Sequence, residues 1–143
     1  MITYDEFAIK VYFKLKHNIF AYEDIIWNRI FDKIINEIGI AKTIEYLSML
    51  YFNDDRTIDK KYRTEFFKIN VLTFLSMYCK KQNNDKNIYK ILTAAFKDDR
   101  KTLNTLAIDC SQKLNLYQFL PYIMYKERNN EQRKLSIIKN FIK

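Results

Sequence analysis

The sequence contains almost no glycine or proline, with one of each in 143 residues. An average chain of this length would have about ten glycines and about seven prolines. β-Sheet proteins need glycine in hairpins, bulges and tight turns, and a chain with 48% hydrophobic residues is too apolar to remain disordered. We therefore expect an all-α fold: a compact bundle of about six to eight helices, forming a single domain over residues 1–143.

Residues that usually carry catalysis or bind metals are also scarce. His17 is the only histidine, and Cys79 and Cys110 are the only cysteines, far apart and among apolar neighbours. This set does not supply a zinc site, and neither a glycine-rich phosphate loop nor a GxSxG motif is present. Asp54–Asp55 and Asp98–Asp99 each precede an expected helix, where carboxylates cap backbone N–H groups. We expect no catalytic residue, no metal, no cofactor and no enzyme activity.

The sequence has no long hydrophobic run either. No stretch approaches the roughly 18 apolar residues of a membrane span, and the opening MITYDEFAIK has acidic residues where a signal peptide would be apolar. The two cysteines have apolar neighbours and form neither a CxxC motif nor a disulfide framework, so we expect buried free thiols in a reducing compartment. We expect a cytoplasmic protein without a membrane partner.

Helical periodicity is what the sequence does contain. Apolar residues recur every three or four positions over residues 4–16, 22–38 and 40–52. The single glycine, Gly39, falls between the second and third of these segments. Because the position after a helix end favours positive φ, Gly39 predicts a turn between two helices.

The second part of the chain predicts further helices. A long helix is expected over about residues 59–81. Its first half is amphipathic, with Tyr62, Phe66 and Ile69 inward and with Lys60, Lys61, Arg63 and Lys68 outward. Its second half is apolar nearly all round, which is typical of the central helix of a bundle. Shorter helices are expected over residues 87–97 and after residue 100. Pro121 predicts a break near Leu120, and a last helix should turn Leu135, Ile138 and Phe141 inward.

The positive charge is concentrated in the second part of the chain. The net charge is +8, but residues 1–55 contain 6 basic and 9 acidic residues, whereas residues 56–143 contain 19 basic and 8 acidic residues. This asymmetry indicates a polyanionic partner such as RNA, although a solvated lysine-rich surface would have the same composition. Lys and Arg bind phosphates without reading sequence. The candidate RNA-binding residues are Arg56, Lys60, Arg63, Lys68, Lys80, Lys81, Arg100 and Lys101.

The stretch INEIGIAKTIEYL resembles a segment of the small helical Cas11 subunits, of the Cmr5 kind, in type III CRISPR effector complexes. In that family a helix ends in an Asn-Gly-Leu-like turn, and the next helix reads roughly Ala-x-Thr-Leu-x-Phe-Leu. The positions that match here are Gly39, Ile40, Ala41, Thr43, Ile44, Tyr46 and Leu47. The family's proline ahead of this turn is missing.

The resemblance implies a non-catalytic role in a ribonucleoprotein complex for antiviral defence. Copies of the subunit would stack along the complex and contact the backbone of the guide–target RNA duplex and the larger Cas subunits. The matched positions are structural ones, so the candidate RNA-binding residues rest on the charge of this sequence alone.

A hypothesis from a different class fits the same composition. A small viral or mobile-element helical protein would bind and inhibit a host protein, with Tyr, Phe and Arg as anchors. RNA binding should weaken steeply with salt, whereas a hydrophobic interface should not. A DNA-binding helix–turn–helix is disfavoured, because Ile44, Tyr46 and Leu47 after the turn have the pattern of core residues.

Overall fold

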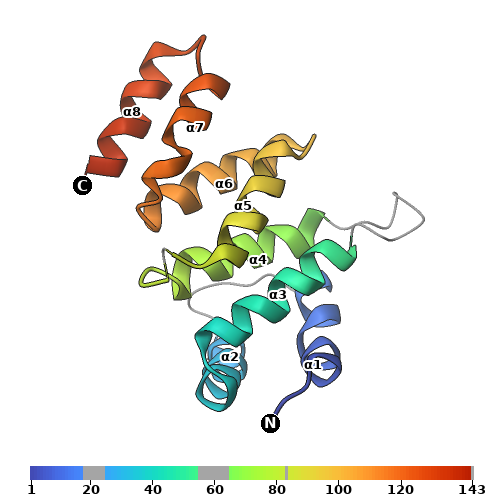
Figure 1. The fold of residues 1–143 in the computed structure, drawn as a ribbon. Helices are drawn as coiled ribbons and strands as arrows, with labels where there is room; N and C mark the ends of the chain where they lie inside the picture. Colours follow the sequence, from blue (N-terminus) through green and yellow to red (C-terminus); the bar gives the residue numbers. More distant parts are fainter. Residues whose placement is uncertain (18–24, 55–64, 83, 143) are drawn as a thin grey trace.

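The structure is a computed structural model that describes residues 1–17, 25–54, 65–82 and 84–142. Within these ranges all regular structure is helical, so the all-α prediction is confirmed. The helices are α1 (Tyr4–His17), α2 (Ile25–Ile38), α3 (Ile40–Asp54), α4 (Glu65–Tyr78), α5 (Lys86–Lys97), α6 (Lys101–Lys113), the 3₁₀ helix η2 (Tyr117–Phe119), α7 (Leu120–Lys126) and α8 (Glu131–Ile142) (Figure 1). Among the described helices, none is both long enough and apolar enough to cross a bilayer.

Helix α4 lies in the middle of the fold (Figure 1). It packs against α1 and α3 on one side and against α6 on the other, while α5 bridges α3 and α6. Helices α7 and α8 form a hairpin at the end of the molecule away from the N-terminus, and α8 packs on α6. A helix covered in this way needs apolar residues nearly all round, so the prediction that the second half of the 59–81 segment is the central helix is confirmed. The predicted start of that helix, residues 59–64, lies outside the described residues. Buried side chains from all eight α-helices of the described chain form the core.

The single glycine has the conformation that the sequence predicts. Gly39 has a φ of +85° and separates α2 from α3. Its N–H donates to the carbonyl of Ile35 at 2.7 Å, and its own carbonyl accepts from the Thr43 hydroxyl at 2.8 Å. The turn therefore ends one helix and begins the next with its backbone groups hydrogen-bonded on both sides.

Gly39→Ala is expected to lower the free energy of unfolding by about 1 kcal/mol, because an L-residue in the left-handed region crowds its own backbone. A Cβ at this position would meet no atom within 4 Å, so the cost comes from φ alone. Urea denaturation measures the change. Gly39→Asn, which tolerates positive φ better, should lose less. Equal stability of the alanine variant and the wild type would contradict a strained turn.

The C-terminal helices agree with the sequence in one respect and differ in another. Pro121 lies in the first turn of α7, directly after η2, so the predicted break near Leu120 is confirmed. Leu135 was expected inward but is 58% exposed, and Ile137 is buried in its place. The α8 helix therefore sits at a different rotation from the one that its apolar pattern predicts.

Both cysteines are buried free thiols, as predicted. Cys79 follows the end of α4 and Cys110 lies on α6, which packs against α4. Burial raises the pKa of both thiols, and that of Cys110 reaches about 12. The two side chains are therefore neutral core residues at physiological pH.

Candidate nucleic-acid interface

The predicted RNA-binding residues do not gather on one surface of the described chain. Those that lie outside the described residues are Arg56, Lys60 and Arg63. Lys80 and Lys81 are exposed in the turn after α4, whereas Arg100 and Lys101 lie where α6 begins. The 12 residues of α5 separate these two pairs by about 18 Å of helix.

Lys68 is a core residue, so its predicted position on an exposed face is wrong. Its side chain is 2% exposed, and its Nζ lies 4.7 Å from the centroid of the Tyr51 ring on α3. A cation over an aromatic face is stabilised by the ring's quadrupole. Because α3 covers this side of α4, Lys68 helps to join the two helices and is closed off from phosphates in solvent.

Arg100 is already engaged by a carboxylate. Its Nε and its Nη2 lie 2.9 Å from the two oxygens of Asp98, and its backbone N–H donates to Asp98 Oδ1 at 2.9 Å. The guanidinium lowers the pKa of Asp98 and has its own pKa raised. Arg100 is also the N-cap residue of α6, and its side chain caps no amide. Asp98 thus fixes the turn between α5 and α6 through Arg100, and it does not cap α6 itself.

Asp98→Asn is expected to lower the free energy of unfolding at pH 7, and this decrease should be smaller in acid. Since the folded-state pKa of Asp98 is lowered, the carboxylate stabilises the fold above its unfolded pKa of about 3.9, and this stabilisation is lost as pH falls through the folded pKa. Urea unfolding of both proteins at neutral pH and below about pH 3 measures the difference. Asp99→Asn, at an exposed neighbour, is the control. If Asp98→Asn lowers the free energy of unfolding by the same amount at both pH values, the stabilising role of the Asp98 carboxylate is wrong.

The most regular basic feature of the described chain is a stripe along α5. Lys86, Lys90 and Lys97 are exposed, and together with exposed Thr93 they follow the spacing of one helical face. We call these three residues the α5 lysine stripe. Helix α5 contains no acidic residue, and the three lysines form no ion pair with any described residue. Their ammonium groups are therefore available to an external anion.

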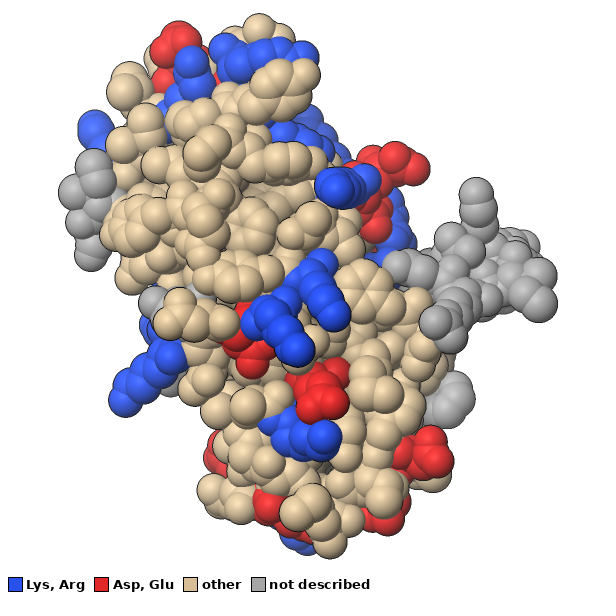
Figure 2. All heavy atoms as spheres, in the orientation of Figure 1, with Lys and Arg blue, Asp and Glu red and all other residues tan. Residues whose placement is uncertain are grey.

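The surroundings of this stripe are basic on a larger scale. On the face shown in Figure 2, most Lys and Arg side chains lie in the middle and upper parts, among uncharged surface and some acidic side chains, and acidic side chains are more frequent in the lower part. The lower part corresponds to α1–α3 in the same orientation. The charge asymmetry along the sequence is thus also an asymmetry in space, which favours approach of a polyanion to the α5 side.

Sequence analysis missed Lys86 and Lys90, although the signal was present. The two lysines are four residues apart at the start of the segment predicted as a helix over 87–97, and Lys97 continues the same face. Neither lysine stands in a dense basic run, because Lys86 follows Asp85 and Lys90 stands between Tyr89 and Ile91.

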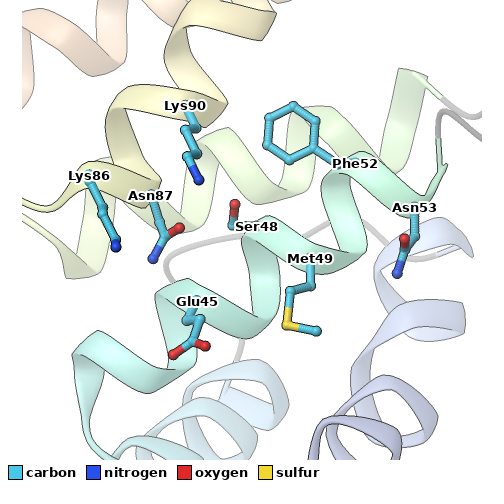
Figure 3. A pocket seen from close by; sticks show the side chains of 8 residues that line it. All are labelled: Glu45, Ser48, Met49, Phe52, Asn53, Lys86, Asn87 and Lys90. Carbon is cyan, nitrogen blue, oxygen red and sulfur yellow. The ribbon is translucent and has the colours of Figure 1, made fainter.

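The N-terminal half of α5 forms one wall of a groove, and α3 forms the other (Figure 3). The groove has a volume of about 670 Å³ and is lined by Glu45, Ser48, Met49, Phe52, Asn53, Lys86, Asn87 and Lys90. Lys90 extends from α5 toward Ser48 on α3 in this view. Two lysines of the stripe therefore border a groove that also offers apolar and hydrogen-bonding surface.

No protein-family model, curated protein or solved structure matches this chain. Within the described residues, no three His, Cys, Asp or Glu side chains come together in a way that could hold a metal ion. The candidate interface consequently rests on the geometry and charge of this chain alone.

Proposed function

We propose that this protein is a non-catalytic RNA-binding subunit that contacts the sugar–phosphate backbone through the α5 lysine stripe. The observation that carries the proposal is the row of exposed lysines on one helical face, without a carboxylate on that helix. At 1.5 Å per residue, Lys86 and Lys97 lie about 17 Å apart along the axis, a length over which a strand carries several phosphates. Such contacts position a protein on nucleic acid without reading its sequence.

The complex that we propose for this subunit is a type III CRISPR effector. The resemblance around Gly39 supports this assignment, and its matched positions have coherent structural roles here. Gly39 forms the turn, Thr43 closes it, and Ile44 and Leu47 are buried in the core. The partners would be guide and target RNA, the larger Cas subunits and further copies of this chain.

A salt series tests RNA binding directly. The purified protein is titrated against labelled duplex and single-stranded RNA from about 25 to about 300 mM KCl. If each lysine of the stripe neutralises one phosphate, the logarithm of the association constant should fall with the logarithm of salt concentration with a slope of about −2 to −3. Absence of binding to either RNA at the lowest salt would contradict the proposal.

Inhibition of a host protein is the second candidate function, and one surface feature favours it. Tyr125 is 65% exposed, and the Arg128 guanidinium lies 4.4 Å from its ring centroid, at the C-terminal end of α7. Tyr and Arg are the residues most enriched in binding hot spots. A partner held through this pair should remain bound at salt concentrations that release RNA, so the same series separates the two functions.

A further inference from the structure

Ser48 is unusual among the buried hydroxyl residues of the described chain. Thr43, Ser76 and Ser111 each donate a hydrogen bond to the carbonyl four residues earlier. Ser48 is 5% exposed, yet its hydroxyl makes no hydrogen bond to a described residue. Ser48 lines the groove between α3 and α5, and its hydroxyl is not sealed from that groove, so it can hydrogen-bond to a ligand there.

The residues around Ser48 offer three kinds of contact. Phe52 lies one turn further along α3, and Met49, which is 41% exposed, also lines the groove, so this wall offers apolar surface. The Asn87 amide extends from α5 on the opposite side (Figure 3). Lys86 and Lys90 add positive charge at the same wall. A ligand that fits all of these has a flat apolar face, a hydrogen-bonding edge and negative charge nearby.

We propose that this groove binds one unpaired nucleotide of an RNA strand whose backbone follows the α5 lysine stripe. The base lies against Phe52 and Met49, and its polar edge reaches Ser48 and Asn87. The phosphates on either side meet Lys86 and Lys90. This inference rests on the proposed RNA-binding function and adds to it a preference for single-stranded RNA, because a paired and stacked base does not enter a groove.

The lining favours a nucleotide over an acidic peptide helix. An amphipathic helix docks by laying an apolar face into a hydrophobic groove. Here the apolar surface is limited to Phe52 and Met49, and the remaining lining residues are polar or charged.

The test compares two RNA strands that have the same number of phosphates, one intact and one abasic, by fluorescence anisotropy at low salt. The intact strand is expected to bind about tenfold more tightly, because base–aromatic stacking is absent from the other. Millimolar adenosine monophosphate should compete with the intact strand only. In the Ser48→Ala/Asn87→Ala variant the intact strand should lose the part of this advantage that hydrogen bonds to these two side chains supply, about threefold, while the abasic strand keeps its affinity. Thr93→Ala, on the stripe but outside the groove, is the matched control.

The outcomes separate this inference from the proposed function. Equal binding of the intact and abasic strands would overturn the nucleotide site and leave backbone binding by the stripe intact. Absence of binding by both strands would overturn both proposals. If a synthetic acidic amphipathic peptide binds and is lost in the Ser48→Ala/Asn87→Ala variant, while RNA strands are bound without regard to their bases, the groove is a protein-docking site and the nucleotide site is wrong.

Discussion

The triple variant Lys86→Glu/Lys90→Glu/Lys97→Glu is expected to bind RNA about 100-fold more weakly at about 0.1 M salt. The slope of the logarithm of the association constant against the logarithm of salt concentration should become less negative by about 2. Each lysine that neutralises a phosphate releases condensed counterions, so its loss removes both affinity and salt dependence. All three side chains are exposed, and the opposite face of α5 carries the core contacts. The substitutions should therefore leave the fold intact, which circular dichroism and urea unfolding would verify.

The matched control for this triple variant lies on the other side of the molecule. Lys10→Glu, Arg29→Glu and Lys33→Glu change the net charge by the same amount, at exposed positions on α1 and α2. This variant should lose less than about threefold in affinity if the stripe is the binding surface, because charges beyond a Debye length of about 10 Å are largely screened. Similar losses in both variants would mean that overall charge, and not the stripe, attracts RNA.

The features that sequence analysis predicted correctly depend on local chemistry. Gly39 ends a helix because its missing Cβ allows a φ of +85°, and Pro121 begins one because its ring fits the first turn. The apolar stripe of α2 also matches, since Trp27, Phe31 and Ile34 are buried. The backbone preferences of Gly and Pro and the periodicity of apolar residues act within a few residues, so they can be recognised in the sequence alone.

The groove depends on tertiary contacts and was not predictable in the same way. Ser48 and Phe52 lie on α3, whereas Asn87 and Lys90 lie on α5, about forty residues later in the chain. No spacing in the sequence indicates that these two helices pack side by side. That the Ser48 hydroxyl lines this groove is likewise visible only in the folded structure.

Lys68 shows why periodicity fails in a central helix. The expected rotation of this helix was set by Phe66 and Ile69, but both are only partly buried, while Phe67 and Val71 are fully buried. A helix with neighbours on several sides has no consistently exposed face, so its apolar pattern does not define a direction. A lysine in such a helix can be buried if its ammonium finds a partner, and Lys68 has the Tyr51 ring at 4.7 Å.

Lys68→Glu is therefore expected to lower the free energy of unfolding by about 3 kcal/mol or more, because it places a carboxylate in the core in place of a stabilised cation. The negative ring face of Tyr51 would repel it, and Asp98 is near enough to interact electrostatically with residue 68. Lys68→Met keeps an aliphatic side chain and removes the charge, so it should lower the free energy of unfolding by less. Lys81→Glu, at an exposed site, should stay within about 0.5 kcal/mol of the wild type. Urea unfolding distinguishes these cases: wild-type stability of Lys68→Glu, with weakened RNA binding, would place Lys68 on the surface after all.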